Sequence, residues 1–358
     1  MVYDNSSIRV DALSLDEVRA DPVLQAALAN AGKGHVQRDP DWLANIALNA
    51  LEPGEEAVFM TARGAADDPA ILPLKLNRAG GRAEALGNFY TSDWAPVLPR
   101  QNGAVLLHAL CAALAANKDV AELRLAPLRE DSAALPLLQD ALEDTGWLAR
   151  HEYLCFGNWS HNTDGADFND YLAQRPSQLR NTLRRRTRQF REAGGTLQLV
   201  TGAAELAEAL ASFTEVYQAS WKRPEPYPDF IPGLAAVAAT RGWLRLGVAR
   251  RDGRAVAAQM WLVANATAYI FKLAYREDAA AYSPGTVLTG FMLQEAIDKD
   301  RVAVIDYLSG DDAYKRDWMS TRREYRGIAA YNGRRLAGRG RALVHQLKTG
   351  VKRLRSLR

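Results

Sequence analysis

Two short segments of the chain contain the residue types that phosphate binding and proton transfer require. The first reads Tyr-Ser-Pro-Gly-Thr over residues 282–286 and precedes a helical pattern over 286–298. Such a helix start directs free backbone N–H groups and a partial positive charge at one point, which suits a phosphate. Ser283 suits the N-cap, and Pro284 suits the first helical position, where its missing N–H is not needed. The simpler interpretation is a helix cap without a ligand.

The second segment follows an apolar strand predicted over 302–308. Asp306 interrupts that strand, where a carboxylate is costly unless it is paired. Lys315 follows the turn at Gly310 and is expected to return toward Asp306. A carboxylate can take a proton from an amine, and a cation can stabilise an oxyanion. We interpret Asp306 as a base or amine-binding group, Lys315 as an oxyanion or carboxylate binder, and Asp311 as a third catalytic candidate. The alternative is a buried structural ion pair.

A strongly basic helix is predicted upstream of these segments. Residues 175–191 contain seven arginines and no acid. Arg180, Arg184, Arg188 and Arg191 fall within about 80° of arc on one helical face. Like charges repel, so an anion or an acidic surface should neutralise this face. The candidate partners are the phosphates of a cosubstrate that donates a chemical group, a group-accepting substrate that carries a nucleotide diphosphate, a tRNA, or the acidic surface of the protein itself.

Several other residues have the character of substrate contacts. Lys272 is the only charge in the strand predicted over 268–275, so we expect it to face a cleft or a carboxylate, with solvent as the alternative. Trp221 begins a Pro-rich loop in which aromatic and polar groups together suit sugar or amino-acid recognition. Tyr282, Tyr314 and Arg180 complete the predicted substrate contacts. A loop packed by its own aromatic side chains is the alternative for the Trp221 segment.

These residues need a two-domain scaffold to position them. The chain has 358 residues, enough for two domains. We predict a first domain over 1–160, a second over 161–335 and a basic C-terminal helix over 336–358, with a polar linker at 157–167. In each domain, predicted strands and helices alternate, and the sequence Arg-Asp-Gly-Arg at 251–254 predicts a β-hairpin.

Charge is unevenly distributed along the chain. The formal net charge is +3, but residues 334–358 contain nine Lys or Arg and no acid. The predicted C-terminal helix places apolar residues on one side, namely Leu343, Val344, Leu347, Val351 and Leu354. This pattern fits contact with an anionic membrane surface or docking onto the globular part. No run of residues has the length and apolarity of a membrane span, and no signal peptide is evident at the N-terminus. The two cysteines are expected to be buried thiols, and the histidines and cysteines have no metal-ligand spacing.

The order of elements, the Ser-Pro-Gly turn and the spacing Asp306-x-x-x-Gly310-x-x-x-Tyr314-Lys315 resemble GNAT acyltransferases. Within that superfamily, the sequence resembles the FemAB-like proteins and their CelD-type relatives from polysaccharide clusters. The resemblance implies an α/β (α+β) protein with two tandem GNAT-like domains. Each domain would contain a mixed, mostly antiparallel sheet flanked by helices.

The resemblance also implies a function. It suggests an N-acyltransferase that moves an acyl group from acyl-CoA, or a similar thioester, to an amine on an amino sugar or an envelope or exopolysaccharide precursor. The thioester would be a cosubstrate, with no tightly bound cofactor and no metal. Ser283, Gly285, Thr286, Arg184 and Arg188 would bind this donor, although Pro284 removes one N–H that the usual GNAT turn provides. The sequence has no Gly-x-Ser-x-Gly motif and no Cys/His pairing, so direct attack by the amine is expected.

Two alternatives belong to different classes. One is a FemX-type enzyme that transfers an amino acid from aminoacyl-tRNA to a peptidoglycan precursor, although no heptad insertion for a tRNA-binding arm is visible. The other is a non-catalytic scaffold of a polysaccharide assembly. The expected location is the cytoplasm, with peripheral contact at the inner membrane through residues 336–358.

Overall fold

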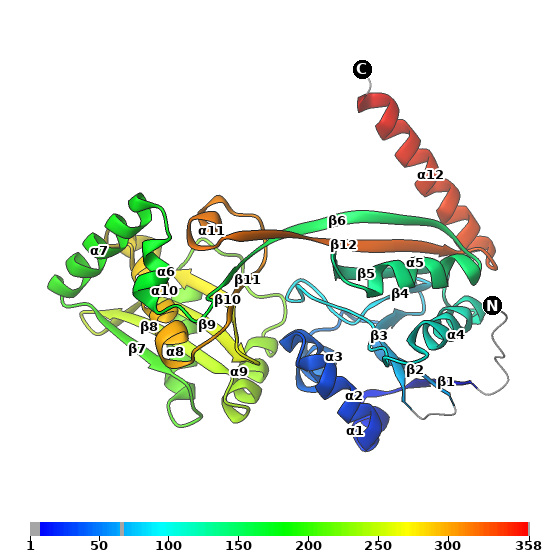
Figure 1. Ribbon diagram of the computed structural model, residues 1–358, viewed down its shortest axis with the longest axis horizontal. Coiled ribbons are helices and arrows are strands. Elements are labelled where there is room, and N and C mark those ends of the chain that lie inside the picture. The colour runs from blue at the N-terminus through cyan, green and yellow to red at the C-terminus, as the bar shows by residue number, and fades with distance from the viewer. Residues whose placement is uncertain (1–7, 65–67, 357–358) are drawn as a thin grey trace. The chain divides into compact units, whose positions relative to one another are not determined.

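A computed structural model describes residues 8–64 and 68–356. The chain divides into two compact units (Figure 1). The first contains Met1–Phe156 and Glu324–Arg358, and the second contains Gly157–Arg323. Residues 324–335, which we expected in the second domain, therefore belong to the first unit.

The first unit contains a mixed, mostly antiparallel sheet in the strand order β1-β2-β3-β4-β5-β12-β6, with β4 and β5 parallel. Its strands are β1 (Arg9–Leu13), β2 (Glu55–Arg63), β3 (Ala70–Asn77), β4 (Arg82–Ala85), β5 (Glu122–Arg129), most of β6 (Trp147–Asn162) and most of β12 (Thr321–Asn332). Its helices are α1 (Leu15–Ala20), α2 (Pro22–Gly32), η2 (Val36–Arg38), α3 (Pro40–Asn49), α4 (Gly103–Ala116), α5 (Ala134–Asp144) and α12 (Leu336–Ser356).

The core of the first unit lies between α4, α5 and the sheet. Leu107, Leu110 and Leu114 recur at helical spacing and are fully buried against β2 and β3 residues such as Leu72. Trp147 is also fully buried, and its indole N–H donates to the carbonyl of Cys111. Burying side chains of this size stabilises the fold by about 1.5–3 kcal/mol each. Cys111 and Cys155 are free thiols; Cys111 is buried, as expected, whereas Cys155 is only partly buried.

The second unit contains a sheet in the order β6-β11-β10-β9-β8-β7, in which β10 and β11 are parallel and the other pairs are antiparallel. Its further strands are β7 (Thr196–Val200), β8 (Leu244–Arg251), β9 (Arg254–Ala264), β10 (Thr267–Tyr275) and β11 (Val304–Ser309). Its helices are α6 (Phe168–Ala173), α7 (Ser177–Glu192), α8 (Leu206–Gln218), α9 (Phe230–Thr240), η3 (Glu277–Tyr282), α10 (Pro284–Gln294), η4 (Glu295–Lys299) and α11 (Ala313–Trp318).

The predicted hairpin is confirmed between β8 and β9. Arg251 pairs with Arg254, and Asp252 and Gly253 both have positive φ, at 50° and 76°. Two successive residues with positive φ match the right-handed twist of the flanking strands, and Asp-Gly tolerates that conformation well. The hairpin fixes the register of β9, which pairs in turn with β10.

The predicted linker over 157–167 is wrong in its first half. Residues 157–162 continue β6, where Ser160 pairs with Asp306 and Asn162 with Val304. Their polar side chains resemble those of a linker in the sequence, but several of them make hydrogen bonds within the second unit. Asn158, for example, donates to Asp306 and to the carbonyl of Leu308.

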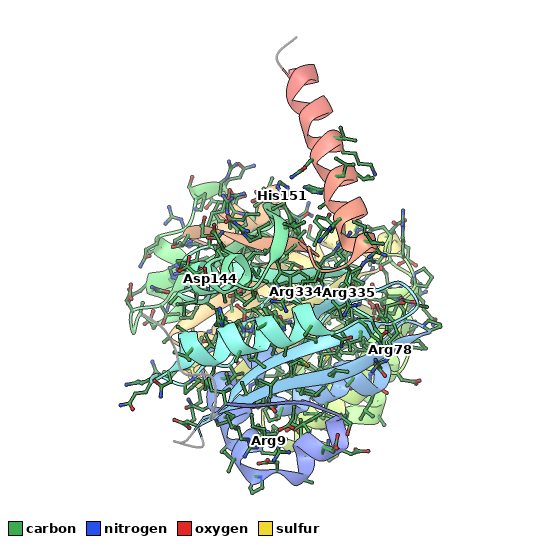
Figure 2. All side chains as sticks on the ribbon, turned by 90° about the vertical axis from the view of Figure 1, so that its right-hand side faces the viewer. Arg9, Arg78, Asp144, His151, Arg334 and Arg335 are labelled. Carbon is green, nitrogen blue, oxygen red and sulfur yellow. The ribbon has the colours of Figure 1, made fainter. Side chains whose placement is uncertain are left out.

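The predicted C-terminal helix is confirmed as α12, which leads away from the end of β12 (Figure 1). Figure 2 shows Arg334 and Arg335 at its foot. The first turns dock onto the first unit, since Ala342 is buried and Arg341 bonds Glu122. Farther along, Leu343, Val344 and Leu347 are 59%, 51% and 62% exposed. The side chains of Val351 and Leu354 lie outside the described residues. Among the helices of the described chain, we find none with the length and apolarity that crossing a bilayer requires.

Candidate active site in the second unit

Three lysines from separate elements of the second unit come together, and we call them the lysine cluster. Lys222 lies in the loop after α8, Lys272 lies on β10 and Lys315 lies on α11. The ammonium groups of Lys222 and Lys272 each lie 5.7 Å from the centroid of the Tyr217 ring. Lys315 is near enough for its charge to affect Lys222. The charges of Lys272 and Lys315 are met by Glu225 and Asp312, so Lys222 is the lysine of the three whose charge an anionic ligand group could still meet.

Lys272 faces a carboxylate, and this confirms one of the environments that the sequence indicated. Its ammonium group donates to Glu225 at 2.8 Å, and the side chain is 8% exposed, which excludes the solvent-facing alternative. Burial lowers the pKa of Lys272, while the ion pair with Glu225 opposes that effect. Glu225 lies three residues after Lys222 in the Pro-rich loop, so Lys272 helps to fix that loop over the sheet.

Lys222 has the most perturbed environment of the three lysines. Burial, with a smaller contribution from the charge of Lys272, lowers the pKa of Lys222 to about 8. Its ammonium group also lies 6.0 Å from the centroid of the Trp221 ring. A lysine whose pKa is near neutrality can exchange a proton with a reacting group under physiological conditions.

Lys315 supports the turn that follows β11. Its ammonium group donates to the carbonyls of Ser309 at 2.6 Å and Gly310 at 3.2 Å, and it pairs with Asp312 at 3.4 Å. Gly310 has φ of 106°, and an added Cβ there would lie 2.9 Å from the Lys315 ammonium. Burial lowers the pKa of Lys315, against the attraction of Asp312. The turn therefore requires both the lysine and the glycine.

Asp306 is buried and bonded on a single oxygen. Its Oδ1 accepts from the Asn158 side chain and from the backbone N–H of Leu308, both at 2.6 Å. The expected partner Lys315 instead binds the carbonyls of the turn. Leu308 has φ of 54°, so the strand bends sharply where Asp306 bonds it. These contacts fix the orientation of the carboxylate near the end of β11, just before the turn that leads to Lys315.

Asp311 lies in an ion pair within the second unit. It accepts from the Trp159 indole at 2.7 Å and pairs with Arg322 at 2.7 Å. The Arg322 hydrogen bonds lower the pKa of Asp311, and the Trp159 bond adds to that effect. The carboxylate is thus held as an anion with two partners, an arrangement that fits support of the turn better than proton transfer.

Aromatic side chains surround the lysine cluster. Trp221 is 51% exposed and lies 4.7 Å from Tyr275, ring centroid to centroid. Tyr314 meets Tyr307 edge to face at 5.9 Å, and burial raises the pKa of both hydroxyls above their usual range. Tyr282 lies elsewhere, under the Arg251 guanidinium at 4.0 Å from its ring centroid. The structure thus places Trp221 and Tyr314 near the cluster and Tyr282 beside the start of α10.

The turn at Ser283–Thr286 begins α10 as predicted, with Pro284 at the first helical position. The expected capping by Ser283 is wrong in detail. Ser283 has φ of 50° and its side chain makes no capping bond, because a left-handed residue cannot direct its hydroxyl at the first turn. The N–H groups of Gly285 and Thr286 have no hydrogen-bond acceptor within residues 8–64 and 68–356. A Cβ on Gly285 would lie 3.0 Å from the Tyr275 ring, so glycine allows the helix start to approach β10.

The strands β10 and β11 separate between this turn and the lysine cluster. They pair only from Thr267–Val304 to Tyr269–Asp306, although β10 continues to Tyr275 and β11 to Ser309. Beyond Tyr269 and Asp306, the facing strand edges of the described chain leave backbone groups without sheet partners. An extended ligand can satisfy such groups, because every buried N–H and C=O requires a partner.

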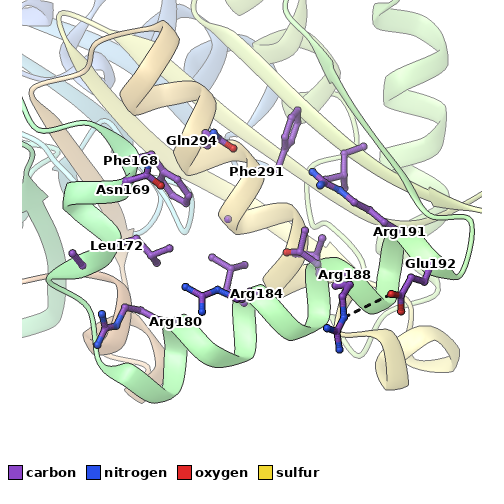
Figure 3. Close-up of a pocket in the computed structure, with 16 residues that line it drawn as sticks. Phe168, Asn169, Leu172, Arg180, Arg184, Arg188, Arg191, Glu192, Phe291 and Gln294 are labelled. Carbon is purple, nitrogen blue, oxygen red and sulfur yellow. Dashed lines mark ion pairs between the residues drawn. The ribbon is translucent and has the colours of Figure 1, made fainter.

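A second feature is an arginine-lined pocket between α7 and α10, with a volume of about 660 Å³ (Figure 3). Arg180, Arg184, Arg188 and Arg191 line it, which confirms that these residues share one face of α7. Leu183 of α7 also lines the pocket, and the remaining walls come from α6, β7 and α10, with apolar side chains of Phe168, Leu172, Leu197, Val287 and Phe291. Arg188 pairs with Glu192 at 3.7 Å.

Sequence reasoning missed Lys222 as a candidate catalytic residue. It stands between Trp221 and a run of prolines, which suggested recognition rather than proton transfer. Its character depends on Lys272 and Lys315, which lie 50 and 93 positions away in the chain. Residues that far apart in the sequence form no local motif that would indicate a catalytic lysine. The tandem Trp-Lys before a Pro-rich loop was the only available indication.

Comparisons with known proteins agree with this geometry. Residues 177–316 match the family model described as Acetyltransferase (GNAT) domain, so the second unit contains a GNAT domain of the FemAB/CelD-like type. No curated protein matches the sequence.

Three solved structures share the fold across most of the chain. FemX aligns with a TM-score of 0.62 and 11% identity over 89% of this chain and 96% of FemX. A tandem GNAT protein from the clavulanic acid biosynthesis pathway aligns with a TM-score of 0.51 and 13% identity over 91% and 99%. L-PGS from Bacillus licheniformis aligns with a TM-score of 0.50 and 11% identity over 81% and 88%. The expected mixed α/β fold of tandem GNAT type is confirmed, and the family match makes the chain a GNAT-type acyltransferase in general terms.

Proposed function

We propose that the second unit transfers an acyl group from a thioester, acyl-CoA or similar, to an amine on an amino sugar or another envelope-glycan precursor. One observation supports this most strongly. Lys222, Lys272 and Lys315 converge where β10 and β11 separate, beside a helix start whose Gly285 and Thr286 N–H groups have no acceptor in the described part of the chain. A thioester arm can lie between the separated strands with its phosphates at the Ser283–Thr286 turn. Its carbonyl then reaches the lysine cluster.

The cluster supplies the charge that the reaction needs. Attack by an amine on a thioester carbonyl develops an oxyanion, and preorganised cations stabilise it most where water is excluded. Lys222 is assigned to this oxyanion, since Lys272 is paired with Glu225 and Lys315 with the 309–310 carbonyls. Lys315 positions the turn, and Asp311 supports it through Arg322.

The proposed step balances without a covalent enzyme intermediate. The amine nitrogen forms a bond to the thioester carbon, and the C–S bond breaks. Asp306 takes the proton that the amine loses, and the Lys222 ammonium protonates the departing thiolate. Because burial brings the pKa of Lys222 to about 8, close to that of a thiol, this transfer requires little driving force. Solvent then returns the proton from Asp306 to Lys222.

The acceptor is proposed to contact Trp221 and Tyr314. Trp221 is exposed and contacts the Tyr275 ring in a tilted arrangement, so it offers a flat apolar face, and sugar rings pack well on such faces. Since acyl thioesters of coenzyme A are made in the cytoplasm, the same proposal places the reaction there.

A second candidate function is transfer of an amino acid from aminoacyl-tRNA. The arginine-lined face of α7 and the likeness to the FemX fold both favour it. In that case the ester carbonyl of the tRNA would occupy the position of the thioester. The arginines would then contact many phosphates rather than a few.

The test combines binding and turnover. A thermal-shift panel of acyl-CoA thioesters should raise the melting temperature for at least one member, because ligand binding stabilises the folded state by mass action. Amine-dependent thiol release with amino sugars should follow for the same thioester. If no thioester raises the melting temperature and aminoacyl-tRNA supports transfer, the thioester proposal is wrong and the second candidate replaces it.

A further inference from the structure

The arginine-lined pocket is separate from the proposed transfer site. Its walls run along the side of α10 from Val287 to Gln294 and along α7, and they include neither the Ser283–Thr286 turn nor any member of the lysine cluster. Figure 3 shows Arg180, Arg184 and Arg188 on α7 and Phe291 and Gln294 on α10. The proposed transfer site therefore does not account for this pocket.

Positive charge in the pocket exceeds what the protein neutralises. Among the described residues that form its walls, Glu192 is the only acid, and it is 3.7 Å from Arg188. Within residues 8–64 and 68–356, no carboxylate forms a salt bridge with Arg180, Arg184 or Arg191. The Nε of Arg180 is buried without a hydrogen-bond partner. The protein's own acidic surface, one of the explanations that the sequence left open, does not neutralise this face.

The floor of the pocket is apolar. Leu183 and Val287 line it and belong to the apolar core of the second unit, and Phe291 lines it and packs against that core. Gly290 allows this close packing of α7 on α10, because a Cβ there would lie 2.5 Å from Leu183. A bare inorganic anion would satisfy the guanidinium groups and leave this floor uncovered. The pocket is shaped for a ligand with an anionic end and an apolar or ring-containing body.

We propose that this pocket binds an organic phosphate, with the phosphates on Arg184 and Arg188 and the body of the ligand over Leu183, Val287 and Phe291. Guanidinium groups match phosphate geometry through paired hydrogen bonds, and four of them on one face can hold a diphosphate. The ligand could come from two sources. It is the nucleotide end of the donor if coenzyme A extends along α10, or it is a nucleotide-linked acceptor. The inference does not depend on the chemistry proposed for the lysine cluster.

Isothermal titration at low salt tests this, with coenzyme A, UDP, inorganic pyrophosphate and bulk tRNA as probes. Coenzyme A or UDP should bind with one-to-one stoichiometry, and pyrophosphate should compete but bind more weakly because it cannot cover the floor. The double variant Arg184→Gln/Arg188→Gln should weaken binding of whichever of coenzyme A and UDP binds the wild type by about 30-fold or more, because two charge-assisted contacts are lost. Binding of coenzyme A identifies the donor as the source, and binding of UDP identifies the acceptor.

Arg185→Gln is the matched control. Arg185 is exposed on the same helix and does not line the pocket, so this variant should bind within about twofold of the wild type. All variants should remain folded, because glutamine keeps helix propensity and the replaced side chains are exposed.

Three results would overturn the proposal. The first is no binding of any small probe, and the second is equal binding by the wild type and the double variant. The third is arginine-dependent binding of tRNA alone that weakens steeply with salt, the signature of many phosphate contacts. Because the readout is equilibrium binding, each result is independent of whether acyl transfer occurs.

Discussion

Replacing Lys222 with methionine should stabilise the protein while abolishing acyl transfer. Methionine keeps the unbranched length of the side chain and removes the charge. Burial lowers the pKa of this lysine from 10.5 to about 8, which means that the folded state disfavours its charged form. At about 1.4 kcal/mol per pKa unit, the penalty at pH 7 is on the order of 3 kcal/mol.

Other contributions reduce that figure. Lys222 is only partly buried, and methionine loses the attraction of the ammonium group to the Tyr217 and Trp221 rings, worth about 0.5–1 kcal/mol each. We therefore expect a net stabilisation of about 1–2 kcal/mol at pH 7. For a unit of this size, the melting temperature should rise by about 2–8 °C.

The pH dependence gives an independent check on the sign. Between about pH 8 and 10.5, unfolded Lys222 holds its proton while folded Lys222 has lost it. The unfolded state then binds more protons, so wild-type stability rises with pH in this window relative to the variant. The advantage of Lys222→Met should be fully present below about pH 8 and should fade toward pH 10.5.

Thermal unfolding from pH 6 to 10.5 measures both effects, with Lys299→Met as the control. Lys299 is exposed in the same unit, so its replacement should change stability by less than about 0.5 kcal/mol at every pH. A Lys222→Met protein that is less stable than wild type at pH 7 would contradict this prediction. Lys222 would then be a structural residue whose contacts outweigh its burial.

Three further predictions follow from the same structure. Asp306→Asn should fold, because the amide oxygen can still accept from Asn158 and Leu308. If Asp306 is the base, the variant should lose about 100-fold in turnover with an amine acceptor. An unchanged rate would mean that Asp306 has only a structural role. Lys315→Met should lower the free energy of unfolding by about 1–3 kcal/mol in denaturant, because the carbonyls of residues 309 and 310 lose their hydrogen-bond donor. An unchanged free energy of unfolding would show that water replaces the lysine as donor. The wild type should sediment with anionic vesicles, and added salt should weaken this binding. The double variant Leu343→Gln/Leu347→Gln should bind the vesicles more weakly but stay folded, because both leucines are exposed on a basic helix. Equal sedimentation of the two proteins would exclude membrane contact by α12.

The sequence predicted the elements whose patterns are local. The α7 arginine face, the β8–β9 hairpin and the start of α10 at Pro284 all depend on spacing within one or two turns, and the structure confirms them. Lys272 could be predicted to meet a carboxylate because one charge in an apolar strand must be paired or exposed. These inferences needed no knowledge of distant contacts.

The rest depended on distant segments. Polar residues at 157–162 were predicted as a linker because their partners, such as Asp306, lie far along the chain. Lys222 was missed as a catalytic candidate because its pKa is set by burial and by Lys272. The return of residues 324–335 to the first unit likewise results from strand pairing, since Ala330 of β12 pairs with Leu123 of β5.

The pH profile of amine-dependent thiol release tests whether the lysine cluster performs acyl transfer. For wild type, kcat/KM should fall as pH rises through about 8, where Lys222 loses its proton. Lys222→Arg should retain measurable activity and move that fall to higher pH, because arginine stays protonated, and Lys222→Met should lose at least about 100-fold at all pH values. Equal rates of thiol release by all three proteins, with the same pH profile, would contradict a role for Lys222 in acyl transfer.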